Sequence, residues 1–178
     1  VTVSGVNDIP TIANLNGDAL AYDEGDGAVV IEQGGNVAVA DVDSADFDTG
    51  TLTVSISANR DATDDELSIN NVGGGAGEIG ISGTDVEYGG VVIGTFAGGT
   101  GTNDLVITFD ADATPTVVTA LLKQITYENT DTDNPTANAR TVSFVLTDGD
   151  GGTSATSSAT VTVSGVNDIP TIANLNGD

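Results

Sequence analysis

The chain of 178 residues carries 27 Asp and Glu against three Lys and Arg, for a formal net charge of −24. A nucleic-acid partner is excluded because phosphate binding requires Lys and Arg, and membrane insertion is not expected because no apolar run approaches the roughly 18 residues of a spanning helix. The chain has no Cys and no His, which excludes the usual zinc and copper sites.

β-Strands are expected along most of the chain, because short runs of alternating or β-branched residues are separated by Gly-rich turns. In chain order, strands are predicted at residues 36–40, 51–57, 66–70, 78–81, 91–96, 105–109, 124–127, 141–147 and 155–164. The clearest is TLTVSIS at 51–57, in which Leu52, Val54 and Ile56 share one face and polar residues occupy the other. That alternation is typical of a half-buried strand.

One short helix is predicted at about residues 114–123. Thr114 can cap it and Pro115 suits the first helical position. Val118, Leu121 and Leu122 then fall on one face, which must pack on the sheets for so short a helix to persist. Many strands and one helix indicate an all-β fold, a β-sandwich with Greek-key connections.

The sequence VTVSGVNDIPTIANLNGD occurs twice without a difference, at residues 1–18 and 161–178. An exact match of this length indicates a tandem array, unless the duplication was engineered at the ends. We therefore expect residues 1–8 to be the last strand and linker of a preceding repeat. Residues 9–168 form one complete repeat in this interpretation, and residues 169–178 begin the next.

Acidic residues gather immediately before and after the predicted strands. They occur in the segments AYDEGDG, ADVDSADFD, TYENTDTD, LTDGDGG and GVNDIP. Solubility alone does not require this placement, although a merely solvated acidic surface is the alternative explanation. Calcium prefers six to eight oxygen ligands that converge from loops, so the sequence favours calcium binding.

The succession of acidic motifs resembles that of the cadherin domain. The motifs are Glu24, Asp41-x-Asp43, Glu128, Asp148 and the linker Val166-Asn167-Asp168-x-Pro170. The segment 120–170 is similar to the cadherin-like repeats of very large bacterial surface proteins and RTX-type adhesins, and the resemblance extends over nearly the whole repeat. It implies an Ig/cadherin-like sandwich with calcium ions (Ca²⁺) at the junctions between consecutive repeats.

The resemblance also implies two half-sites in each repeat. Towards the preceding repeat, the ligands would be Asn7, Asp8, Asp41, Asp43 and Asp148. Towards the following repeat, they would be Glu24, Glu128, Asn167 and Asp168.

Three departures from the family pattern reduce the expected number of ions at each junction. The family usually has Asp at the positions of Gly165 and Thr126, and Asn at the position of Ile169. Gly5 is the equivalent of Gly165 in the first copy of the linker. One or two ions are therefore expected at a junction instead of three. The segment 70–104 is longer than such a domain needs and is predicted to form an extra hairpin region.

Two further motifs resemble calcium sites of other kinds. GGTGTNDLV at 98–106 resembles one RTX calcium nonapeptide, but a lone copy favours a hairpin turn. Asp148-Gly-Asp150 lacks the later Glu of an EF-hand, so a turn or a single ligand is expected. Paired carboxylates can hydrolyse glycosides, but His and Cys are absent, and no enzymatic activity is expected.

The predicted function is that of a calcium-rigidified rod segment in a giant extracellular adhesin or surface filament. Its partners would be neighbouring identical repeats, with cell-surface glycans or proteins bound through other domains. Two alternatives stay open: a multivalent carbohydrate- or protein-binding module that uses the segment 70–104, and a subunit of a self-assembling fibre.

Overall fold

Strands dominate the computed structural model, which describes residues 5–170. The strands are β1 (Thr11–Ala13), β2 (Ala19–Asp23), β3 (Val29–Val30), β4 (Ala38–Ala40), β5 (Thr51–Ala58), β6 (Asp65–Ile69), β7 (Ile79–Ser82), β8 (Asp85–Tyr88), β9 (Val91–Ala97), β10 (Leu105–Phe109), β11 (Ile125–Asn129), β12 (Ala139–Leu146) and β13 (Ser157–Ser164). The single described helix is α1 (Pro115–Leu122). The strand predicted at residues 1–4 and the new repeat predicted from residue 171 lie outside the described residues.

The strands form three sheets. The largest has eight strands in the order β2-β13-β12-β5-β10-β9-β8-β7. A second sheet has the order β3-β11-β6, and β1 pairs with β4 alone. The all-β prediction is confirmed at this level, and the arrangement is consistent with a β-sandwich.

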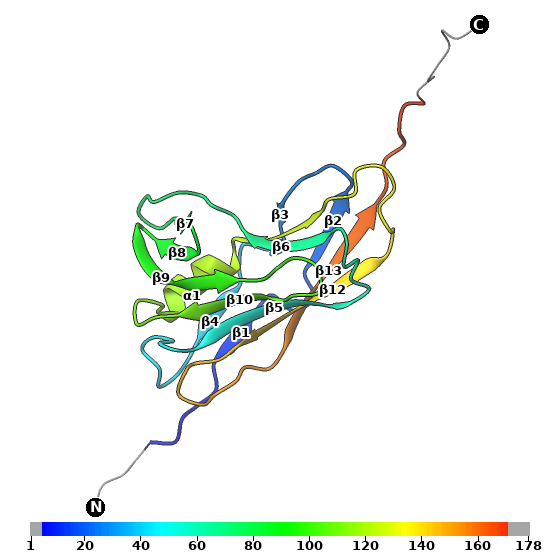
Figure 1. Cartoon of the computed structure of the whole chain (residues 1–178). Coiled ribbons are helices and arrows are strands. Elements are labelled where there is room, and N and C mark those ends of the chain that lie inside the picture. Colours follow the sequence, from blue (N-terminus) through cyan, green and yellow to red (C-terminus); the bar gives the residue numbers. More distant parts are fainter. Residues whose placement is uncertain (1–4, 171–178) are drawn as a thin grey trace, which may run out of the picture.

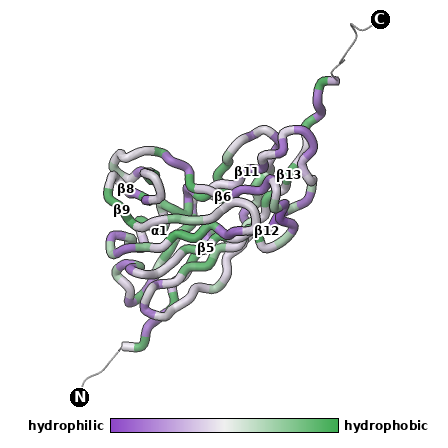
Figure 2. Tube along the Cα trace, viewed as in Figure 1, coloured by the Kyte–Doolittle hydropathy of each residue, from purple (hydrophilic) through white to green (hydrophobic). Residues whose placement is uncertain are grey.

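The core is shared by all three sheets and the helix. Leu52 and Val54 of β5 are completely buried, as their alternation predicts, and Tyr127 of β11 and Leu121 of α1 belong to the same core cluster. Figure 2 shows green, hydrophobic stretches around β5 in the interior, and purple, hydrophilic residues in many of the loops. Burial of this apolar surface is the main force that holds the layers together.

One cation lies inside this core. Arg140 on β12 has 0% exposed surface, and its guanidinium pairs with the Asp65 carboxylate at 3.0 Å and 3.2 Å. The hydroxyl of Tyr127 and the amide of Asn129 donate to the same carboxylate. Burial by itself would raise the pKa of Asp65. The hydrogen bonds to its carboxylate, of which the one from Arg140 has the largest effect, outweigh burial and lower the pKa below its ordinary value.

The segment 70–104 forms the predicted extra hairpin region. Strands β7, β8 and β9 pair in antiparallel order, and β9 joins them to the main sheet through β10. The motif GGTGTNDLV forms the turn between β9 and β10 with residues 98–104, and its last two residues begin β10, as expected of a hairpin. A side chain at Gly98 would collide with the carbonyl of Asp104, so this turn requires glycine.

The ends of the described chain lie at opposite ends of the molecule (Figure 1). The segment before β1 enters at one end, and the segment after β13 leaves at the other. This geometry suits units that follow one another in line. Among residues 5–170, no helix is both long and apolar enough for a membrane span.

Candidate functional site

Strand pairing places the first linker beside the predicted Asp-x-Asp motif. β1 and β4 are antiparallel, with Thr11 opposite Ala40. The residues that precede β1 therefore lie next to Asp41, which directly follows β4. The Thr11 hydroxyl donates to the Ala40 carbonyl at 3.1 Å and Pro10 is buried, which fixes the linker where it meets the repeat.

Side-chain contacts join the linker to two predicted ligands from distant parts of the chain. The Asn7 amide donates to Oδ2 of Asp148 at 2.8 Å. The backbone N–H of Asp8 donates to both carboxylate oxygens of Asp43 at 3.2 Å. The structure thus brings together four of the five residues predicted for this half-site in direct contacts, and Asp41 joins them through the Asp43 N–H.

Asp148 is a buried carboxylate at the end of the molecule where the first linker enters. It is 1% exposed, and its Oδ1 accepts the backbone N–H groups of Asp150 and Gly152. Burial raises the pKa of Asp148, but these bonds and that from Asn7 outweigh burial and lower the pKa below its ordinary value. The carboxylate is therefore ionised, as a metal ligand must be.

Gly152 permits this close approach. A Cβ built at Gly152 would collide with Oδ2 of Asp148 and would lie 2.9 Å from both the Asn7 amide nitrogen and the Asp8 carbonyl. Sequence reasoning did not single out this glycine. The run Asp-Gly-Asp-Gly-Gly indicated a turn, but it carried no sign that the distant linker lies on it.

Asp41 presents a carboxylate oxygen without a partner. Its Oδ1 accepts the N–H groups of Asp43 and Ser44 at 3.2 Å, which orders the loop. Its Oδ2 is buried and has no hydrogen bond. The Ser44 hydroxyl, three residues later in the chain, is also buried and also has no hydrogen bond. Buried polar atoms normally have partners, so this oxygen suits a cation. Ser44 was not predicted, because serine in an acidic loop carries no distinct signal.

At the exit end, a parallel strand pair brings Glu24 to the second linker. β2 and β13 run side by side, with Asp23 opposite Ser164. The N–H of Glu24 donates to the Ser164 carbonyl at 2.9 Å. The Oε2 atom of Glu24 is buried without a partner, and it would lie 3.4 Å from a Cβ at Gly165.

Glu128 lies on β11 near this end, opposite Glu66 of β6. Like charges directly opposite in a sheet destabilise it unless they are compensated. The Tyr22 hydroxyl of β2 donates to the carbonyl of Asn129, the residue after Glu128, at 3.2 Å, which joins β2 to this end of β11. Glu24 and Glu128 therefore belong to the same end of the molecule.

Asn167 and Asp168 do not meet the other predicted ligands in this structure. Both are exposed, and the one side-chain hydrogen bond described for the pair runs from the Asn167 amide to the Asp168 carbonyl at 3.1 Å. The same bond forms between Asn7 and Asp8 at 3.0 Å. Both copies of the Asn-Asp pair make this local bond, and within residues 5–170 only the first copy also hydrogen-bonds to distant side chains.

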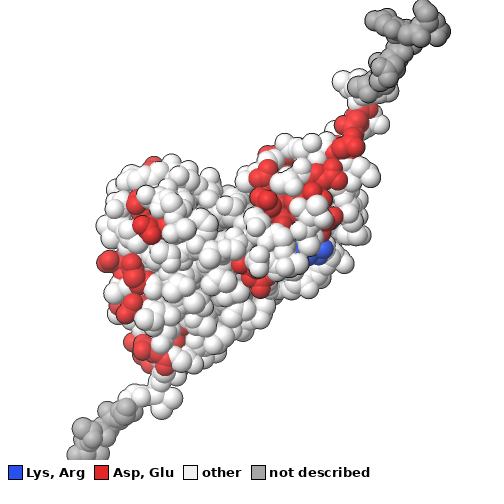
Figure 3. Space-filling view, in the orientation of Figure 1, with Lys and Arg blue, Asp and Glu red and all other residues white. Residues whose placement is uncertain are grey.

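Acidic side chains gather at both ends of the face drawn in Figure 3. Among residues 5–170, however, no three acidic side chains converge closely enough to hold a metal ion on their own. Comparisons with protein-family models, with curated proteins and with solved structures found no match.

Proposed function

We propose that this chain is a structural repeat of an extracellular tandem array in which Ca²⁺ closes each joint between neighbours. One observation carries the proposal. Two carboxylate oxygens in the described chain are buried without a partner, and they belong to Asp41 at the entry end and Glu24 at the exit end. Both residues are ligands implied by the cadherin resemblance, and each lies beside one copy of the same linker.

The proposal includes an Ig/cadherin-like sandwich with Greek-key connections. Its support is the combination of mainly antiparallel sheets and a chain that enters and leaves the molecule at opposite ends. Acidic loops at both ends suit such a rod, since each joint then has one acidic end from each neighbour.

Calcium would be held by oxygens from two consecutive repeats. Asp41, Asp43 and Asp148 would contribute from the later repeat, with Asn7 and Asp8 from the linker. Glu24 and Glu128 would contribute from the earlier repeat, for which Asn167 and Asp168 are the linker residues. A bound ion supplies positive charge that offsets the repulsion between these carboxylates and ties the linker to both units.

Apolar residues support direct contact between repeats. Val6 and Val42 are 87% and 88% exposed at the entry end, and Val166 and Ile169 are exposed at the exit end. Exposed valine and isoleucine beside an acidic motif gain stability when a neighbour covers them. Partners of this chain would accordingly be copies of the same repeat.

Calcium titration of a protein with two consecutive repeats tests the proposal. We expect calorimetry to detect binding in the range of about 10⁻⁴ to 10⁻³ M that extracellular modules show. Asp43→Asn in the second repeat should weaken binding about tenfold or more, because it removes a charged ligand. Asp85→Asn on β8 makes the same change away from both ends and should leave the affinity unaltered. Equal effects of the two substitutions, or no calcium binding, would contradict the proposal.

A further inference from the structure

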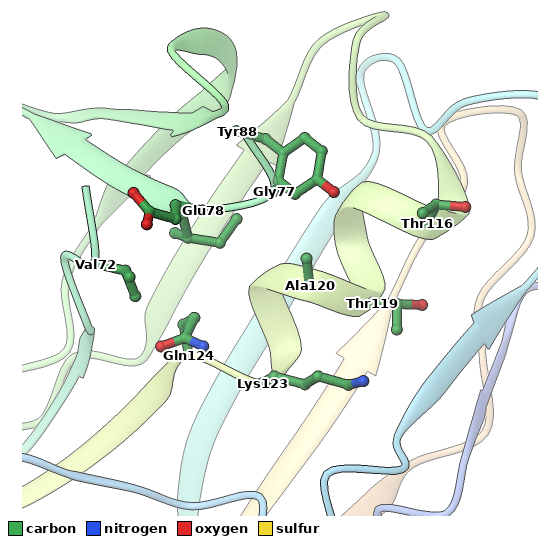
Figure 4. A pocket seen from close by; sticks show the side chains of 10 residues that line it. Val72, Gly77, Glu78, Tyr88, Thr116, Thr119, Ala120, Lys123 and Gln124 are labelled. Atoms are coloured by element: carbon green, nitrogen blue, oxygen red, sulfur yellow. The ribbon is translucent and has the colours of Figure 1, made fainter. Parts of the chain in front are cut away.

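A cavity of about 390 Å³ lies between the added hairpin and helix α1 (Figure 4). None of the residues that line it belongs to the calcium proposal. The volume falls within the range of about 300 to 1,000 Å³ typical of small-molecule sites. The added hairpin, whose role the sequence left unexplained, supplies one wall of this cavity.

Regular structure builds both walls. On α1, Thr116, Ala120 and Lys123 recur at spacings of four and three, so they share one helix face that lines the cavity. On the opposite wall, the β7–β8 pair sets Ile79 directly across from Tyr88. Figure 4 shows the Tyr88 ring above the helix and the Lys123 side chain extended along its lower end.

Three hydrogen-bond donors of the cavity have no partner among residues 5–170. Lys123 forms no ion pair, whereas Arg60 pairs with Asp104 and Arg140 pairs with Asp65. The Tyr88 hydroxyl donates to no group. Gln124 accepts from the Asn70 amide at 2.8 Å, which holds its side chain and leaves its own N–H₂ group free. In a chain of net charge −24, a lysine without an acidic partner is unusual.

An acceptor is held in place on the hairpin side. The backbone N–H of Gly75 donates to Oε2 of Glu78 at 2.9 Å. A Cβ at Gly73 or Gly75 would lie 2.8 Å or 2.7 Å from the same oxygen, so the Gly-rich loop can close on this carboxylate because it has no side chains. The other oxygen, Oε1, accepts no described hydrogen bond and can accept one from a ligand.

We propose that this cavity binds an uncharged pyranose sugar residue. A sugar hydroxyl both donates and accepts, and the cavity offers it the Gln124 amide and the Tyr88 hydroxyl. The Glu78 carboxylate and the Lys123 amine lie at opposite sides of the rim, where they can meet groups that extend beyond the sugar ring (Figure 4). The Tyr88 ring gives an apolar face for the C–H groups of the sugar ring. Polyanionic glycans are disfavoured by the charge of the whole chain, and an ion alone would leave most of the cavity unfilled.

In a tandem array, this site would recur once in each repeat. Weak binding at a single site would then add up along the rod, because linked sites act at high effective concentration. The inference does not depend on calcium at the joints, and each proposal can fail without the other.

The experiment is an array of neutral hexose and N-acetylhexosamine oligosaccharides, with sialylated and uronate oligosaccharides as acidic comparators. Glycans that bind are then titrated into the isotope-labelled protein and followed by NMR. We expect neutral glycans to bind at millimolar concentration and to shift the signals of Tyr88, Lys123 and Gln124. Absence of binding, or binding of acidic glycans alone, would overturn the proposal.

Variants separate this cavity from other surfaces. Tyr88→Ala removes the ring and should weaken binding about tenfold, while Tyr88→Phe keeps the ring and should lose less. Val91→Ala, on the same hairpin but outside the cavity, is the matched control and should bind like the wild type. Circular dichroism verifies that each variant is folded. Unchanged affinity of a folded Tyr88→Ala protein would refute the assignment.

Discussion

At the scale of single residues, Arg140 and Asp65 form the more deeply buried of the two ion pairs in the described residues. Both side chains are fully buried, and carbonyls of Thr136 and Asn138 accept the remaining guanidinium N–H group. The sequence indicates that Arg140 faces the core, because it is two residues before Val142 and four before Phe144 and so lies on the same face of the strand. Its partner could not be predicted, since Asp65 lies in another sheet, 75 residues away.

Arg140→Ala should therefore lower the free energy of unfolding by about 3 to 5 kcal/mol, because Asp65 would stay buried without its counter-charge. Arg60→Ala is the matched control. Its pair with Asp104 is partly exposed, and such pairs contribute about 1 kcal/mol or less. Urea denaturation of both variants measures the two values. Similar losses would contradict the account of the buried pair.

The lowered pKa of Asp65 predicts how this contribution varies with pH. A carboxyl whose pKa is lower in the folded state stabilises the protein above its unfolded pKa of about 3.9. That stabilisation is lost as the pH falls through the folded value. The difference in unfolding free energy between wild type and Asp65→Asn should be constant above about pH 5 and shrink below about pH 4. Denaturation across this range measures it, and a constant difference would refute the prediction.

At the scale of elements, alternation in the sequence located most of the structure. The strands predicted at 51–57, 105–109 and 141–147 appear within two residues of their predicted bounds, and the helix predicted at 114–123 spans Pro115–Leu122. The strands β1, β2, β3 and β8 were not predicted. β1 and β3 have three and two residues, too few for a period to show. β2 and β8 carry acidic residues that are uncommon in strands.

Helix α1 is attached to β4 by one side chain that the sequence did not distinguish. The Thr119 hydroxyl donates to the Pro115 carbonyl at 2.8 Å and accepts the N–H of Val39 at 2.9 Å. Thr119→Val keeps the shape and leaves that N–H without a partner, so it should cost about 1 to 3 kcal/mol.

Thr116→Val is the control on the same helix, because Thr116 is exposed and makes no side-chain hydrogen bond. It should change the free energy of unfolding by about 0.5 kcal/mol or less. Thermal and urea denaturation compare the two valine variants. If Thr119→Val proved as stable as Thr116→Val, the hydroxyl would not fix the helix to the sheet.

At the scale of the whole molecule, the candidate site could be predicted in part. The acidic motifs and the repeated linker indicated the candidate residues. Their grouping depends on two strand pairs, β1 with β4 and β2 with β13, and these bring together residues that the sequence keeps far apart. The cavity beside α1 could not be predicted, because it forms only where the added hairpin meets the helix.

The central claim is that calcium stiffens a chain of such repeats at their joints. In this proposal, the carboxylates of Asp41, Asp43 and Glu24 would repel their neighbours across the linker in the absence of calcium, and the joint would bend freely. One or two bound ions would tie the linker to both units and straighten the array.

Small-angle X-ray scattering of a protein with several consecutive repeats tests this claim most directly. The measurement compares calcium at millimolar concentration with an excess of chelator at constant ionic strength, and magnesium serves as the control for unspecific screening. The account predicts a larger maximum dimension and a longer persistence length in calcium than in chelator or magnesium. Equal dimensions in all three conditions would contradict it.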